Sequence, residues 1–162
     1  MKHIKTLLTL LFISLLSSPS WSQTLGDLVK REGIYYEKFS DVPFTGELTG
    51  QEQGSFKNGE RDGAWTAYRE NGQLWYEGNY KNGKREGARV GYHDNGQLRY
   101  KANFKNGNYE GALVEYWING QLESKGNFKS NKKEGVWVSY NEDGTVHKEF
   151  TGTFKDGKKI SD

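Results

Sequence analysis

The segment ENGQLWYEGNYKNGKREG, residues 70–87, contains both turn phrases of a unit that recurs along most of this sequence. The first phrase, Asn-Gly-Gln-Leu, occurs with one degraded copy at 71–74, 95–98, 119–122 and 143–146. The second phrase, Lys-Asn-Gly or a close variant, begins at residues 57, 81, 105, 129 and 155. The spacing is 24 residues until a two-residue insertion precedes the last, partial copy. A fixed period of this kind indicates a repeat architecture.

Between the phrases, apolar residues alternate with polar ones, as they do in β-strands. One apolar row takes alternate positions from 64 to 68 and reads Ala, Thr, Tyr; its copies read Ala-Val-Tyr, Ala-Val-Tyr and Val-Val-Tyr. A second row takes alternate positions from 74 to 80 and reads Leu, Tyr, Gly, Tyr. Each unit is therefore predicted to contain two strands and two turns.

Loop length decides whether the two apolar rows share one face of the sheet. A three-residue loop at 70–72 pairs Tyr68 with Leu74 and Thr66 with Tyr76, so that the rows coincide. Such a loop is a type I turn that ends in a left-handed residue, and that position favours glycine. Gly72 and its copies occupy it.

We expect the second turn to behave in the same way. A three-residue loop at 81–83 places Leu74 opposite Val90. Where glycine is missing, at Asn131, the substitute is the next best residue for positive φ. These features predict an all-β fold: an elongated antiparallel β-meander of 24-residue hairpin repeats in a single-layer open sheet.

The start of the chain predicts export. Lys2 and Lys5 precede an apolar core of ten residues at 7–16, and small residues follow at Ser20 and Ser22. This is the pattern of a secretory signal peptide at 1–22, too short for a membrane span; a retained anchor is the alternative. Cleavage after Ser22 would remove two lysines from 23 Lys+Arg and leave a balance with the 21 Asp+Glu. We expect a periplasmic or secreted protein and no nucleic-acid partner.

The remaining chain divides into a cap and an array of repeats. Residues 23–53 lack the turn phrase and are expected to form an N-terminal lead-in, irregular or helical at 25–32, and capping strands. Pro43 cannot donate to a ladder and belongs on an edge. Repeats follow over 54–162, as 54–77, 78–101, 102–125, 126–151 and a partial unit at 152–162, whose polar tail closes the other edge.

The sequence offers little material for catalysis. There is no cysteine, and His93 and His147, in different slots of the repeat, do not make a ligand set. His93 occupies the same slot as Arg69 and Trp117, which indicates a variable surface position. We expect no enzymatic activity, no cofactor and no metal site.

Large side chains on the nominally polar face form a candidate patch. Trp65, Arg89, Leu113 and Trp137 share one column of the repeat, and Trp75 faces the same way from the neighbouring strand. If exposed and contiguous, these residues would dock a protein or the sugar rings of a glycan. The alternative is that they pack on each other or under the caps.

The repeated lysines are a second candidate. Lys57, Lys81, Lys105, Lys129 and Lys155 occupy equivalent slots. Neighbours would lie about 10 Å apart, because each repeat adds two strands. Such a row could contact an anionic lipid surface. Recurring acids at 62, 86, 110 and 134 would offset it, and polar residues are expected at a turn in any case.

The repeat resembles the bacterial MORN-repeat-variant family, whose members are often labelled YwqK-type toxin–antitoxin system antitoxins. The phrases that carry the resemblance are YYEKFSDVPFTG (35–46), FKNGERDGAWTAY (56–68), ENGQLWYEGNYKNGKREG (70–87), DNGQLRYKANFKNGNYEG (94–111) and INGQLESKGNFK (118–129). The resemblance implies an elongated single-layer sheet and a non-enzymatic role in neutralising a toxin, scaffolding or contacting a membrane.

The expected function is accordingly that of an exported protein-binding or scaffold module with an antitoxin-like or immunity-like role. The alternative is association with the envelope or with anionic lipid through the lysine turns. A protein partner is expected, and a membrane surface or glycan is a possible one. The identity of the partner and the oligomeric state are not specified by the sequence.

Overall fold

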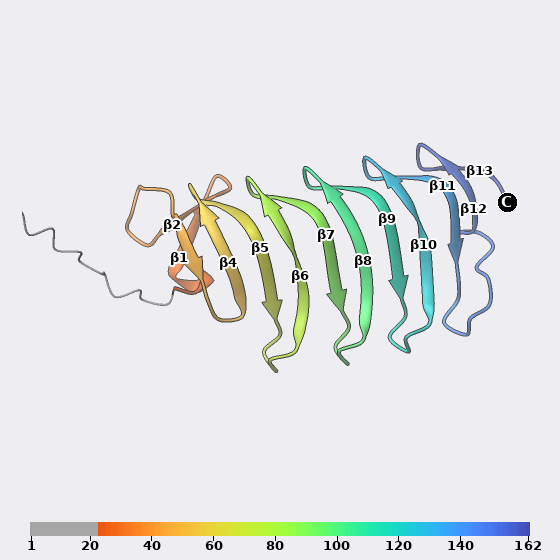
Figure 1. The fold of residues 1–162 in the computed structure, drawn as a ribbon, viewed down its shortest axis with the longest axis horizontal. Coiled ribbons are helices and arrows are strands. Elements are labelled where there is room, and N and C mark those ends of the chain that lie inside the picture. Colours follow the sequence, from red (N-terminus) through yellow and green to blue (C-terminus); the bar gives the residue numbers. More distant parts are fainter. Residues whose placement is uncertain (1–22) are drawn as a thin grey trace, which may run out of the picture.

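A computed structural model describes residues 23–162; the predicted signal peptide, 1–22, lies outside the described residues. One antiparallel sheet runs the length of the molecule, and each of its strands pairs with the next in sequence (Figure 1). Its strands are β3 (Gly46–Leu48), β4 (Glu52–Lys57), β5 (Glu60–Tyr68), β6 (Leu74–Lys81), β7 (Lys84–Tyr92), β8 (Leu98–Lys105), β9 (Asn108–Tyr116), β10 (Leu122–Lys129), β11 (Lys132–Ser139), β12 (Gly152–Lys155) and β13 (Lys158–Ser161). The predicted open antiparallel meander is confirmed.

The loop between β5 and β6 has the predicted length. The Arg69 N–H donates to the Gln73 carbonyl at 2.8 Å, and the Gly72 N–H donates back to the Arg69 carbonyl at 2.9 Å. Gly72 has a φ of 81°, and Tyr68 pairs with Leu74. The glycine at this position is therefore required by the left-handed end of the turn.

A bulge beyond this loop changes the face of the strand. The register shifts after the Tyr68–Leu74 pair, so that Trp75 is an extra residue and Ala67 pairs with Tyr76. Thr66 then pairs with Glu77. The prediction that both apolar rows share one face is wrong, because a bulge moves all later side chains by one position.

The second turn is tighter than predicted. Lys81 pairs with Lys84, which leaves a two-residue loop of Asn82 and Gly83 with φ angles of 49° and 70°. Positive φ at both positions defines the type I′ turn that suits a twisted hairpin. Leu74 is therefore not opposite Val90, which pairs with Glu77. Asn131 has the predicted positive φ, at 65°.

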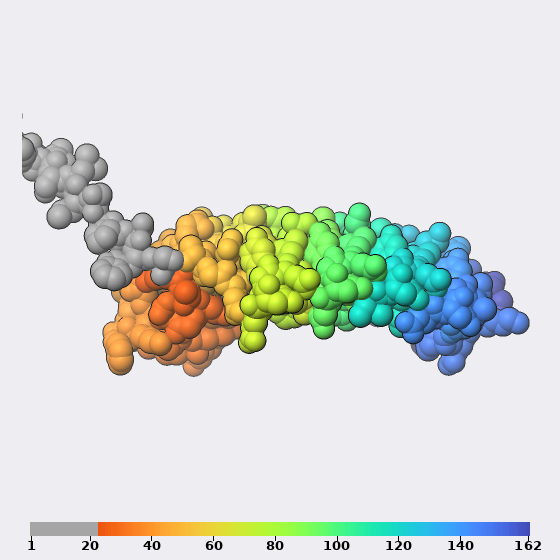
Figure 2. Space-filling model, turned by 90° about the horizontal axis from the view of Figure 1, so that it is seen from below, coloured from red at the N-terminus to blue at the C-terminus, as the bar shows by residue number. Residues whose placement is uncertain are grey.

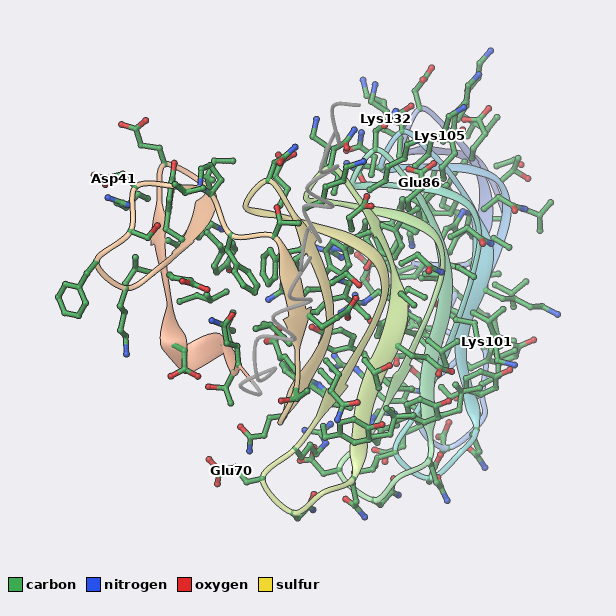
Figure 3. The ribbon with its side chains drawn as sticks, turned by 60° about the vertical axis from the view of Figure 1, so that its left-hand side comes forward. Asp41, Glu70, Glu86, Lys101, Lys105 and Lys132 are labelled. Atoms are coloured by element: carbon green, nitrogen blue, oxygen red, sulfur yellow. The ribbon has the colours of Figure 1, made fainter. Side chains whose placement is uncertain are left out.

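The sheet is curved along its strands, and its two faces differ (Figure 3). Lys101 lies on the convex side, which we call the outer face, in a paired row with Thr66, Glu77, Val90, Val114, Lys125 and Val138. The concave inner face carries Trp65, Ala67 and Tyr76, which are all buried. Large side chains pack against one another in the concavity. Within residues 23–162, this single-layer sheet therefore has a hydrophobic core without a second layer to cover it.

The buried residues of the inner face form two clusters. Phe56 and Trp65 lie in the first, together with residues of the N-terminal cap. Phe104, Leu113, Trp137 and Phe154 lie in the second. Rings meet mostly in tilted or edge-on contacts, such as Phe56 with Trp65 at 5.2 Å between centroids. Such ring contacts stabilise the fold beyond the contribution from burying apolar surface.

Caps cover both ends of the array. A 3₁₀ turn at Leu25–Asp27 leads into the hairpin of β1 (Leu28–Arg31) and β2 (Ile34–Glu37), where an irregular or helical lead-in was expected. Pro43 makes an isolated bridge with Tyr36 beside this hairpin. The polar tail forms β13, the last strand of the sheet. In Figure 2 the orange and blue ends extend further on the lower side than the green repeats between them.

Candidate functional sites: the turn edge and the inner groove

The predicted tryptophan patch is not an exposed surface. Trp65 and Trp137 are each 1% exposed and Leu113 is 5% exposed. With the bulges included in the register, the column of Trp65, Leu113 and Trp137 lies on the inner face. The indole N–H of Trp65 donates to the Ser55 carbonyl at 3.2 Å, and that of Trp137 donates to Asn127 at 2.9 Å. The prediction of a contiguous docking patch is therefore wrong: these residues form the core.

The other two patch residues lie apart from these. Trp75, the bulge residue, is 44% exposed. Arg89 is half-buried, with its guanidinium carbon 3.7 Å from the Tyr76 ring centre and its Nε donating to the Tyr100 hydroxyl at 2.9 Å. Arg89 thus fills the space that tryptophan occupies in other repeats, and its charge rests on aromatic rings.

All of the predicted lysines are exposed, and they gather at one edge of the sheet. We call this edge, formed by the two-residue turns and their flanking residues, the turn edge (Figures 1 and 3). The first column is Lys57, Lys81, Lys105, Lys129 and Lys155. In three of the five hairpins the second strand adds an exposed lysine, at Lys84, Lys132 and Lys158; the other two have Glu60 and Asn108 there.

Hydrogen bonds between successive repeats hold the turns in place. The Gly83 N–H donates to the Arg61 carbonyl of the preceding repeat at 3.0 Å, and the Gly107 N–H donates to Arg85 at 2.9 Å. Equivalent bonds join Asn131 to Tyr109 and Gly157 to Lys133. The lysines therefore project from a stacked and regularly spaced backbone.

The recurring acids lie along this edge and bind its backbone. The Glu86 carboxylate accepts the Asn106 N–H at 2.8 Å, and that of Glu110 accepts the Ser130 N–H at 2.8 Å. Glu134 does the same for Asp156 at 3.1 Å. These carboxylates satisfy the next turn along the sheet, a role that the sequence did not reveal.

The opposite edge is formed by the longer loops and has its own ladder. Side-chain N–H groups of Arg69, His93 and Trp117 lie 2.9, 2.7 and 3.1 Å from the carbonyls of Tyr92, Tyr116 and Tyr140 in the next repeat. His93 is therefore not a free surface position, because its Nε2–H donates to a carbonyl that can only accept. What the three residue types share is a ring or guanidinium N–H, and this was the signal to look for.

A groove opens at the C-terminal end of the inner face. Its volume is about 430 Å³. Aromatic side chains line it at Tyr109, Trp117, Phe128, Trp137, Tyr140 and Phe150. Polar side chains line it at Glu115, Glu123, Ser124, Lys133, Ser139 and His147. We call this the inner groove.

The groove exists because the third repeat departs from the first two. Ser124 takes the slot of Tyr76 and Tyr100, and Glu115 takes that of Ala67 and Gly91. In the second repeat the Tyr100 ring lies over Gly91 so closely that a Cβ there would overlap it. Replacing a ring by serine leaves a hollow of about 430 Å³, where the earlier repeats have one of about 150 Å³.

The polar groups of the groove lie side by side on neighbouring strands. Ser124 pairs with both Glu115 and Ser139, and its hydroxyl donates to the Glu115 carboxylate at 2.8 Å. Burial raises the pKa of Glu123, and the Glu115 carboxylate raises it further. Burial lowers the pKa of Lys133, whose ammonium lies 4.3 Å from the Trp137 ring centre.

Residues 23–162 contain neither a membrane-spanning helix nor a metal-ligand cluster. No helix among them is long and apolar enough to span a membrane. No group of three or more His, Cys, Asp or Glu side chains among them is placed to hold a metal ion.

Comparison with known proteins gives one family. The MORN repeat variant family matches residues 61–82, 85–106, 109–130 and 133–156. No curated protein matches the chain. Among the solved structures that match is the crystal structure of the GtfA/B complex bound to UDP and GlcNAc, at 14% identity and with a TM-score of 0.22. That match covers 68% of this chain and 24% of the other.

Proposed function

This chain belongs to the MORN repeat variant family, and from that premise we propose that it is a non-enzymatic binding protein whose turn edge contacts an anionic surface. MORN repeats indicate a repeat protein that binds proteins or membranes, and the family is typically non-enzymatic. Of the two kinds of partner, proteins and membranes, we assign a membrane to the repeated lysines.

The exposed lysine columns carry this proposal. Successive copies of a lysine lie about 10 Å apart, since each repeat adds two strands. The turns that present them are tied to one another by backbone hydrogen bonds, so little ordering is needed on binding. Each lysine near a charged membrane contributes about 1 kcal/mol, and several acting together on one rigid edge give useful affinity.

The acids at the same edge reduce its positive electrostatic field, but they do not change the regular spacing of the lysines. Glu86, Glu110 and Glu134 accept backbone N–H groups of the next turn and lie along the edge. The opposite edge carries Glu70, Glu142 and Asp143 in its loops, together with Asp94, which is ion-paired with Arg69 at 2.7 Å. An acidic loop edge facing a basic turn edge would orient the molecule with its lysines toward a negative surface.

Export, a scaffold role and antitoxin activity are finer parts of this proposal that rest on the sequence. A signal peptide at 1–22 would place the mature chain outside the inner membrane, next to anionic lipid headgroups. Binding along one edge would leave the outer face and the loop edge free for a protein partner, as a scaffold requires.

Sedimentation with lipid vesicles tests the proposal. Wild-type chain should sediment with vesicles that contain phosphatidylglycerol, and binding should weaken as salt is raised. The K81E/K105E variant should lose most of this binding, while K101E/K125E, the same charge change on the outer face, should retain it. Equal loss in the two variants, or binding insensitive to salt, would contradict the assignment to the turn edge.

A further inference from the structure

We propose that the inner groove binds an oligosaccharide. The site goes beyond the proposed membrane contact and uses a different surface, the C-terminal half of the inner face. Nothing in the repeat unit itself requires a hollow of this size here, because in the first two repeats Tyr76 and Tyr100 leave an equivalent space of only about 150 Å³.

The shape and walls of the groove suit a sugar ring. Its volume of about 430 Å³ lies in the range of about 300–1,000 Å³ that is usual for small-molecule sites. Indole and phenyl rings at Trp117, Phe128 and Phe150 line it. The C–H faces of a pyranose are apolar and pack on aromatic rings, which provide large contact area at little cost in conformational entropy.

The polar groups select a neutral ligand rich in hydroxyl groups. Among the described residues, neither the Glu123 carboxylate nor the Lys133 ammonium has a hydrogen-bond or ion-pair partner, although the ammonium lies over the rings of Trp137 and Phe154. One accepts and the other donates, and a sugar hydroxyl can do both. One carboxylate oxygen of Glu115 accepts the Ser124 hydroxyl, and the other can accept a hydrogen bond from a ligand.

A cationic ligand fits these groups less well. The carboxylates of Glu115 and Glu123 already have positive neighbours. Burial raises the pKa of Glu123, Arg99 opposes that rise, and Lys133 lines the same groove. A guanidinium or ammonium entering the groove would meet Lys133, while a carboxylate ligand would meet Glu115 and Glu123. Hydroxyl groups are repelled by neither.

The test uses the second repeat as the template for closing the groove. In the E115G/S124Y variant the third repeat regains the Gly91–Tyr100 pair, so that a ring covers the floor of the hollow. Trp117 and Trp137 in the groove allow binding to be followed by intrinsic fluorescence during titration with cellotetraose, chitotetraose and maltotetraose. Thermal unfolding and circular dichroism check that the variant is folded.

At least one of the three tetrasaccharides should bind the wild type, and E115G/S124Y should lose that binding by tenfold or more. E123Q, which keeps the shape, should weaken it by about tenfold through the lost charged acceptor. K125A, on the outer face of the same strand, should bind as the wild type does. Failure of all three sugars at millimolar concentration, equal affinity in E115G/S124Y, or preference for an oligolysine peptide would overturn the proposal. Vesicle binding by the turn edge is unaffected by any of these outcomes.

Discussion

At the scale of single residues, large side chains on the inner face are matched to small ones across the strand. Trp65 pairs with Gly54, and a Cβ at that glycine would lie 2.6 Å from the indole Cδ2. Trp137 covers Gly126 in the same manner. Leu113 pairs instead with Ala102, so the smaller side chain leaves room for a methyl group. The variation between repeats is therefore compensated within each pair.

This matching predicts an epistatic pair. Leu113→Trp alone should destabilise the fold by about 1–3 kcal/mol, because the ring would meet the Ala102 methyl group. Adding Ala102→Gly should recover much of that loss, since it recreates the pairing of Trp65 with Gly54. The free energy of unfolding in urea measures both variants. Simple additivity of the two substitutions would contradict the matching.

The Glu123 carboxylate predicts a pH effect on stability. Burial and the Glu115 charge raise its pKa in the folded chain, against the opposing influence of Arg99 and His93. The folded state then holds the proton more tightly than the unfolded state, so this group stabilises the fold at low pH. The contribution is lost as pH rises through the raised pKa. Glu123→Gln should remove this fall and stabilise the chain at pH 7, as measured by unfolding from pH 4 to pH 8; an unchanged pH profile would show that Glu123 is not perturbed.

At the scale of elements, turn chemistry was more predictable than register. The period, the glycines and the loop at 70–72 follow from backbone rules that depend on a few adjacent residues. The bulges do not, because the extra residue is Trp75, Arg99 or Glu123 in successive repeats and has no common chemistry. Because the sequence prediction did not include the bulge, it assigned the two faces of the first strand the wrong way round. Residues of the core were therefore predicted to form an exposed patch.

The loop-edge ladder gives an element-scale prediction. Arg69, His93 and Trp117 each donate a side-chain N–H to a carbonyl of the next repeat. His93→Ala should therefore cost about 1 kcal/mol of unfolding free energy through the lost bond. His93→Arg should cost much less, because arginine makes the equivalent bond one repeat earlier. Equal losses in denaturant unfolding would show that the bond does not contribute.

At the scale of the whole molecule, the repeat separates three surfaces. One edge presents lysines, and the opposite edge presents loops that carry acids (Figure 3). The inner face buries aromatic side chains and opens into the groove at its C-terminal end. The sequence predicted the lysine row because its members are equivalent. It did not predict the groove, which depends on Glu115 and Ser124 meeting across two strands after a bulge has set their register.

Site-specific labelling tests the central claim, that the turn edge is the surface that meets an anionic membrane. The chain has no cysteine, so single cysteines can carry an environment-sensitive fluorophore at Asn108 on the turn edge, Glu70 on the loop edge and Asn103 on the outer face. On phosphatidylglycerol vesicles the label at 108 should shift to the blue and be shielded from aqueous quencher, while labels at 70 and 103 should stay accessible. Shielding at 70 or 103 in place of 108 would contradict the account.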